Sequence, residues 1–139
     1  MRPEGEAGLI VIDSAVWIAW FNGRSGPHVD RLEAALLRNE EILTAPVIIA
    51  EVLEGFSDDR DFELARGVLT GLRSVALDVD GHVQSARLYR SLRKRGITIR
   101  GVVDCIIAQT CLSEGAEILT PDRDFAAIAK HTALRLCAV

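Results

Sequence analysis

The sequence predicts an α/β domain of three layers, in which a mostly parallel central sheet lies between helices. Short apolar runs that suit strands alternate with longer segments whose apolar residues recur at helical spacing. The strand candidates are continuous apolar runs rather than alternating ones, which is typical of a sheet covered on both faces. The 139 residues are enough for one core, and neither a linker nor a repeat divides them. We therefore expect a single domain over residues 1–139.

The first half of the chain is expected to form two strands and four helices. In order, these are a strand at 8–13, helices at 14–21 and 28–39, a strand at 41–45, and helices at 46–54 and 58–72. Leu32 and Leu36 share one face of the helix at 28–39, because residues four apart are neighbours on a helix. Pro46 begins the next helix and Gly55 follows its end, the arrangement that helices favour at their two ends.

The second half continues the alternation of strands and helices. In order, we expect a strand at 74–79, helices at 80–95 and 102–114, a strand at 116–120, a short helix at 121–130 and a strand at 133–138. For the short helix, Thr120 could be the N-cap and Pro121 the first helical residue.

Composition excludes several classes of protein. The first eight residues, MRPEGEAG, contain no apolar run, so we expect no signal peptide. No apolar stretch approaches the roughly 20 residues of a membrane span, so no membrane association is expected. Three cysteines without metal-type spacing indicate reduced thiols and a cytoplasmic location. The three scattered histidines argue against a histidine-based zinc site.

Charge is distributed unevenly along a chain whose net charge is −4. Residues 81–103 contain six lysines and arginines and no acid, so this segment carries +6 and the remainder carries −10. On the helix expected at 80–95, Arg87, Arg90 and Lys94 lie within about 60° of arc. Such a basic strip is either a solvated helix face or a surface that binds a polyanion.

Acidic residues follow two of the expected strands. Asp13 ends the strand at 8–13, and Asp122 and Asp124 come just after the strand at 116–120. In sheets of this class, ligands bind beyond the carboxyl ends of the strands, where the strand order reverses. Taken singly, each acid has a simpler explanation, because Asp13 or Ser14 can cap the following helix and the later aspartates can favour a helix dipole.

Asp104 is not explained by a helix cap. A helical wheel of residues 102–114 places it on the apolar side, between Ile107, Cys111 and Ala108. Burying an uncompensated charge costs several kcal/mol, which is comparable to the stability of a whole domain. Glu51 lies past the first turn of its helix and also falls among apolar residues, although that helix is apolar nearly all round.

Converging acids without basic partners would repel one another, and a divalent cation removes that conflict. Carboxylates are hard oxygen ligands that suit Mg²⁺ or Mn²⁺, and Mg²⁺ usually completes its shell with waters and substrate phosphate oxygens. One or two such ions can activate a water and stabilise the leaving oxygen of an in-line displacement. The substrate class is then a phosphodiester, and the basic strip has a use in holding a polyanion.

Four segments of the chain resemble the motif blocks of the PIN-domain ribonucleases, and in particular the VapC-type toxins of bacterial toxin–antitoxin pairs. The segments are VIDSAVWIAWF, APVIIAEVLEGF, IRGVVDCIIAQTC and ILTPDRDF, in the family's order. The resemblance covers most of the chain, from about residue 9 to residue 136.

The resemblance implies a PIN-like fold and an endoribonuclease that depends on one or two Mg²⁺ or Mn²⁺ ions. Its catalytic and metal-binding acids would be Asp13, Glu51, Asp104 and Asp122, with Asp124 as a further ligand and Ser14 in support. The RNA-binding candidates are Arg87, Arg90, Lys94 and Arg100, the last matching a basic residue often found four positions before the third acid. The implied partners are RNA, with structured RNA such as tRNA the usual substrate, a cognate antitoxin and a second copy of the chain.

Two alternatives remain open from the sequence. VALDVDGH, at 75–82, contains the D-x-D-G nucleophile motif of haloacid-dehalogenase-type phosphatases, in which Asp78 would attack phosphorus and Asp80 would act as acid and base. The simpler explanation of this motif is a turn into the next helix, with Asp80 as its cap. The other alternative is a PIN-like module that binds RNA or protein without catalysis.

Overall fold

The computed structural model describes residues 8–139 and confirms the predicted three-layer α/β/α class. The expectation about a signal peptide concerns residues that lie almost wholly outside this range. The strands are β1 (Ile10–Ile12), β2 (Ile42–Thr44), β3 (Arg73–Ser74), β4 (Glu117–Leu119) and β5 (Arg135–Leu136). The helices are α1 (Ser14–Phe21), α2 (Pro27–Leu37), α3 (Pro46–Leu53), α4 (Asp59–Thr70), α5 (Val79–Lys94), α6 (Val102–Glu114) and α7 (Arg123–His131).

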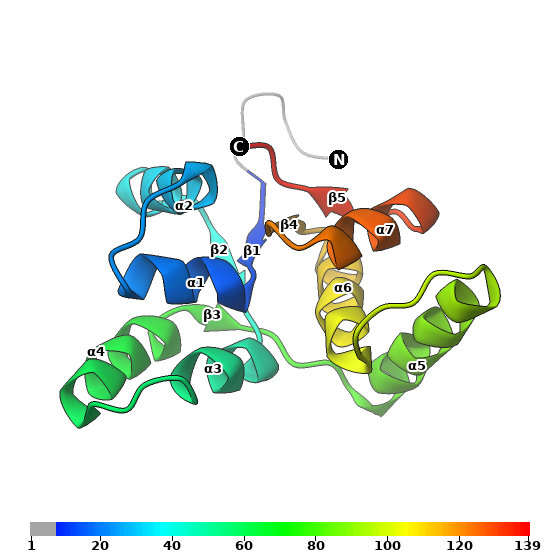
Figure 1. The fold of residues 1–139 in the computed structure, drawn as a ribbon, viewed down its shortest axis with the longest axis horizontal. Coiled ribbons are helices and arrows are strands. Elements are labelled where there is room, and N and C mark those ends of the chain that lie inside the picture. The colour runs from blue at the N-terminus through cyan, green and yellow to red at the C-terminus, as the bar shows by residue number, and fades with distance from the viewer. Residues whose placement is uncertain (1–7) are drawn as a thin grey trace.

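All five strands pair in parallel, in the order β3-β2-β1-β4-β5. From β1 the chain builds outward through β2 and β3, then returns to the other side of β1 for β4 and β5. The strand order therefore reverses between β1 and β4, where a ligand site is expected at the carboxyl ends. In Figure 1, helices α1 to α4 lie on one side of this sheet and α5 to α7 on the other.

The core lies where the central strands meet these helices. Every residue of β1 and β2 is buried, because both strands have neighbours on each side and helices on each face. Trp17 and Phe125 are the largest fully buried side chains. The three cysteines are buried and form no disulfide, as the sequence predicted. No helix within residues 8–139 is long and apolar enough to cross a bilayer.

Two edge strands are shorter than predicted. The run expected as a strand at 74–79 pairs with β2 only through Arg73 and Ser74, and the run expected at 133–138 pairs only at Arg135 and Leu136. An edge strand has a partner on one side alone, so it ends where that single partner ends. Outside these pairs, Val75, Leu134 and Cys137 pack on the core, whereas Val79 begins α5 and is exposed.

Two helix starts also differ from their predicted positions. The N-cap of α7 is Asp122, which accepts a hydrogen bond from the Asp124 amide, so Thr120 is not the cap and Pro121 is not helical. The N-cap of α5 is Asp78 rather than Asp80, because Asp78 accepts a hydrogen bond of 2.8 Å from the Gly81 amide.

Candidate active site

The ends of β1 and β4 bring two aspartates together at the reversal of strand order. Ile12 is in register with Leu119, and the amide of Asp13 donates to the Leu119 carbonyl at 3.0 Å. Asp13 directly follows β1 and caps α1, while Asp122 follows β4 after two residues and caps α7. Each aspartate is therefore a helix cap; the simpler explanation held this for Asp13, whereas for the second helix it named Thr120 as the cap.

Asp13 is held by hydrogen bonds on both carboxylate oxygens. Its Oδ1 accepts from the Ser14 amide at 2.8 Å, and its Oδ2 accepts from the Thr120 hydroxyl at 2.8 Å. The residue is only 5% exposed. Burial raises the pKa of Asp13, an effect that the hydrogen bonds from Thr120 and Ser14 oppose.

Asp104, Asp122 and Asp124 form a compact group of carboxylates. Asp104 comes from the first turn of α6, and one oxygen of each aspartate lies within 4.8 Å of the others. Burial, followed by the negative charges of Asp122 and Asp13, raises the pKa of Asp104 to about 6. The apolar neighbours that the helical wheel gave to Asp104 are themselves buried: Ile107, Ala108 and Cys111.

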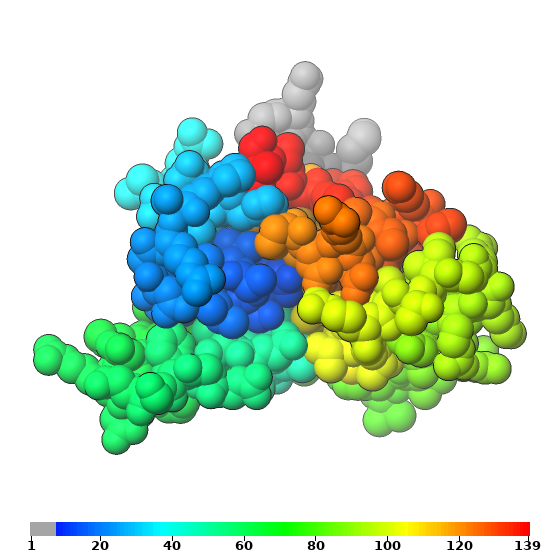
Figure 2. All heavy atoms as spheres, viewed as in Figure 1, coloured from blue at the N-terminus to red at the C-terminus, as the bar shows by residue number. Residues whose placement is uncertain are grey.

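Glu51 approaches the same centre from α3. Its Oε1 is buried and has no hydrogen-bond partner. Burial and then the charge of Asp13 raise the pKa of Glu51, so the two carboxylates are close enough to repel each other. Glu54, one turn further along the chain, is exposed to solvent. Figure 2 shows the surfaces of α1, α3, α6 and α7 meeting in the middle of the drawn face.

The residues at this centre fit a hard divalent cation. Asp104, Asp122 and Asp124 supply oxygen atoms within 4.8 Å of one another, and Asp13 and Glu51 lie outside this group of three; the buried Glu51 Oε1 is an acceptor without a donor. Uncompensated acids that raise one another's pKa are stabilised by a bound cation. We call the five residues Asp13, Glu51, Asp104, Asp122 and Asp124 the acidic centre.

The basic residues predicted to bind RNA lie in two places. Arg87, Arg90 and Lys94 line an open groove of about 400 Å³ on α5, together with Ser91 and Arg95. Arg100 is not part of this groove. Its guanidinium instead forms ion pairs with Asp122 and, at 3.5 Å, with Asp124.

Comparison with known proteins places this arrangement in a family. The PIN domain family model matches residues 10–131, which include every acid of the acidic centre. The chain belongs to the PIN-domain family. It is 33% identical over 133 residues to ribonuclease VapC11 of Mycobacterium tuberculosis and to a VapC ribonuclease of Mycobacterium bovis, covering 91% of this chain and 96% of each relative. The resemblance predicted from the four sequence segments is therefore confirmed.

Solved structures confirm the PIN fold at lower sequence identity. VapBC2 from Rickettsia felis, solved bound to a DNA fragment from its promoter, superposes with a TM-score of 0.74 at 18% identity, covering 93% of this chain and 97% of that one. Mycobacterium tuberculosis VapC20, a toxin that cleaves the sarcin–ricin loop, gives a TM-score of 0.66 at 16% identity, covering 85% and 93%.

Within this PIN domain, the phosphatase motif does not form a second site. Asp78 is occupied as the N-cap of α5, and three residues separate it from the end of β3 at Ser74. β3 is an edge strand, separated from β1 by β2. The aspartate therefore does not follow a central strand directly, as a nucleophile of that class requires.

Thr120 is a site residue that the sequence prediction did not assign. Its hydroxyl donates to Asp13 Oδ2 at 2.8 Å and accepts from the Asp122 amide at 3.0 Å, so one side chain joins two acids of the acidic centre. The only sequence signal is its position between β4 and Asp122, which also suited a helix cap.

Replacing Thr120 by valine should lower the activity of the acidic centre about tenfold, as is typical when a group that orients a metal ligand is lost. The isosteric change removes both hydrogen bonds and raises the pKa of Asp13 further, because the bond from Thr120 lowers it. Initial cleavage rates of the two variants Thr120→Val and Thr120→Ser test this. The serine variant keeps the hydroxyl and should retain most activity; equal losses in both would assign Thr120 a packing role.

Proposed function

We propose that this protein is a Mg²⁺- or Mn²⁺-dependent endoribonuclease that acts as the toxin of a type II toxin–antitoxin pair. The observation that carries the proposal is the meeting of Asp104, Asp122 and Asp124 within 4.8 Å at the strand-order reversal of a PIN domain, where Thr120 joins Asp13 to the same loop. Relatives that are 33% identical over nearly the whole chain are named ribonucleases, which supports RNA as the substrate. We expect the protein to act in the cytoplasm, where its RNA substrates are.

The acids have related roles in this proposal. Asp13, Glu51, Asp104 and Asp122 hold one or two cations, and Asp124 is a further ligand. A bound divalent cation supplies activation of a water and stabilisation of charge on the phosphate. Ser14 orients Asp13 through its amide, which donates at 2.8 Å, and its hydroxyl lies 3.5 Å from the same oxygen.

The basic groove on α5 suits the RNA backbone. Arg87, Arg90, Lys94 and Arg95 place four positive charges around one open groove. α5 packs against α6, the helix that carries Asp104, so the groove and the acidic centre belong to neighbouring elements. An acidic site repels a polyanion, and a nearby basic surface compensates for that repulsion.

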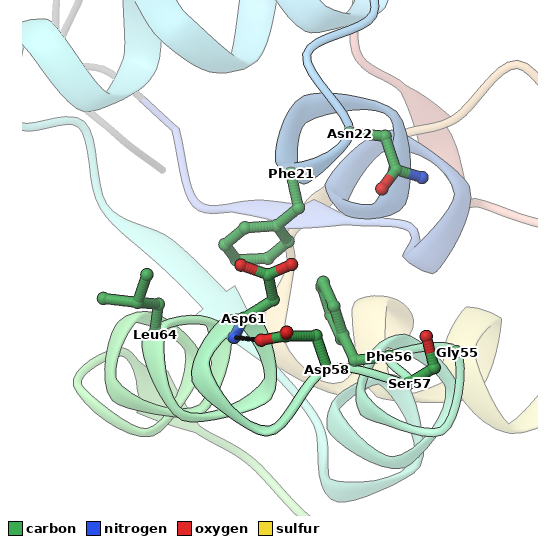
Figure 3. A pocket seen from close by; sticks show the side chains of 8 residues that line it. All are labelled: Phe21, Asn22, Gly55, Phe56, Ser57, Asp58, Asp61 and Leu64. Carbon is green, nitrogen blue, oxygen red and sulfur yellow. Dashed lines mark hydrogen bonds between the residues drawn. The ribbon is translucent and has the colours of Figure 1, made fainter.

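A second groove suits the antitoxin. Phe21, Phe56 and Leu64 give it apolar walls, and Asp58 and Asp61 give it two carboxylates, around a volume of about 280 Å³. Figure 3 shows Phe21 and Phe56 at this groove, where their rings pack edge to face with centroids 5.7 Å apart, with Asp61 beside them. An amphipathic segment with basic residues along one edge would match these walls. The family resemblance implies an antitoxin, whose C-terminal segment would lie across the active-site groove, and a homodimeric toxin. We expect a further part of the antitoxin to bind in this second groove.

Cleavage of RNA by the purified protein tests the proposed function. The protein, freed of metal with EDTA, is incubated with structured RNA, including tRNA, in buffers with and without Mg²⁺ or Mn²⁺. We expect cuts inside the chain that leave 5′-phosphate ends and appear only with metal. Binding of RNA without cleavage under every metal condition would instead favour the non-catalytic module.

A further inference from the structure

Arg100 places a positive charge of the chain itself beside the acidic centre. Its Nη2 pairs with Asp122 Oδ2, and its Nε lies 3.5 Å from Asp124 Oδ2. Its positive charge lowers the pKa of Asp104 and of Glu51, so it compensates part of the repulsion among the acids. Among the ion pairs of residues 8–139, no other joins a basic side chain to this centre.

The backbone around Arg100 is anchored while its side chain is not. Ile99, the preceding residue, is 1% exposed and packs in the core. The Arg100 amide donates to Asp124 Oδ2 at 3.2 Å, which fixes the start of the side chain beside the site. The side chain itself is 77% exposed, so it can rotate into solvent without moving the backbone.

A divalent cation held by the three aspartates would compete with the guanidinium for Asp122 and Asp124. Asp122 and Asp124 belong to the group whose oxygens lie within 4.8 Å of one another, and Arg100 contacts both of them. An exposed ion pair stabilises a protein very little, since solvent screens it. A dication with several carboxylates to bind should therefore displace the arginine.

We propose that Arg100 is a displaceable counter-ion, which occupies the acidic centre before the metal binds and must leave Asp122 and Asp124 when it does. The inference rests on the proposed metal dependence, and it adds a side chain that competes with the metal for the carboxylates. Arg100 then weakens metal binding while it stabilises the metal-free protein. Arg100 acts on the carboxylates and not on the substrate, so it is a positioning residue and not a catalytic one.

Calorimetric titration of the EDTA-treated protein with Mn²⁺ tests this. Arg100→Gln should bind Mn²⁺ about twofold to fivefold more tightly than the unaltered protein, the range expected for loss of one exposed charged competitor. Without metal, the melting temperature of Arg100→Gln should be slightly lower than that of the unaltered protein. On adding Mn²⁺, its melting temperature should rise by more. Arg100→Lys keeps the charge and should return both values toward those of the unaltered protein.

Arg95→Gln is the matched control. It removes the same charge from a nearby position, just after the end of α5. Arg95 contacts His131 and not the acids. If Arg100→Gln binds Mn²⁺ no more tightly than Arg95→Gln, or loses stability equally with and without metal, Arg100 is structural and the inference is wrong. If the unaltered protein binds no Mn²⁺ at all, the proposed metal dependence fails as well.

Discussion

Replacing Asp104 by asparagine should lower RNA cleavage by at least about 100-fold, since loss even of a group that supports a metal ligand costs 10–100-fold. Asp104 belongs to the group of three aspartates whose oxygens lie within 4.8 Å of one another, and the charges of Asp122 and Asp13 both raise its pKa. The asparagine keeps the shape and one oxygen but loses the charge that holds a cation. Single-turnover cleavage at saturating Mn²⁺ measures the effect.

The same substitution should stabilise the metal-free protein at neutral pH. The pKa of Asp104 is about 6 in the folded protein against an ordinary value of 3.8, so its ionisation disfavours folding. We expect a gain of about 1–2 kcal/mol above pH 6, after allowance for solvent screening of a partly exposed group. The gain should shrink between pH 6 and 3.8, where the folded aspartate is protonated first, and vanish below.

Urea unfolding of both proteins in EDTA, from pH 4 to 8, measures this difference. Glu54→Gln is the control, because Glu54 lies on the surface outside the acidic centre. It should leave cleavage unchanged and show no comparable gain. If the variant Asp104→Asn cuts RNA at the rate of the unaltered protein, Asp104 is not an active-site residue.

Changing Arg87, Arg90 and Lys94 together to glutamine should weaken RNA binding on the order of 100-fold near 0.1 M salt. Each lost phosphate contact removes about 0.7–0.9 from the slope of log K against log salt, and three contacts lower that slope by about 2. All three residues line the groove on α5. Fluorescence anisotropy with labelled RNA in Ca²⁺, at several salt concentrations, measures affinity and slope together.

The matched control removes three positive charges from the other side of the sheet. Arg38, Arg60 and Arg66 belong to α2 and α4 or their ends, which Figure 1 places opposite α5. This triple variant should keep nearly the unaltered affinity and slope. Equal losses in the two triple variants would mean that net charge, and not the α5 groove, governs binding to RNA.

The central strands and the helices were predictable from the sequence, whereas the lengths of the edge strands were not. Burial on both faces gives β1, β2 and β4 apolar runs that a single sequence displays. The length of β3 depends instead on where its pairing with β2 ends, at Thr44 and Ser74. That limit is a property of two segments far apart in the chain, so neither segment reveals it.

The residues of the site were predictable to different degrees, for physical reasons. Asp104 stands out because a charge among apolar residues on a long helix breaks the helical pattern. Thr120 gives no such signal, since its hydrogen bond to Asp13 depends on the register of β1 against β4 and its bond from the Asp122 amide is a local turn contact. Arg100 lies before α6 begins, so its position relative to Asp104 does not follow helical spacing. Its contacts with Asp122 and Asp124 could therefore not be predicted from a helical wheel.

Anomalous diffraction from crystals grown with Mn²⁺ tests most directly whether acids from separate elements share one cation. The account predicts a peak at the manganese absorption edge in contact with Asp104 and with Asp13 or Asp122, and with Arg100 turned away from it. An active enzyme whose only manganese lies elsewhere, with Arg100 still paired to Asp122, would contradict it.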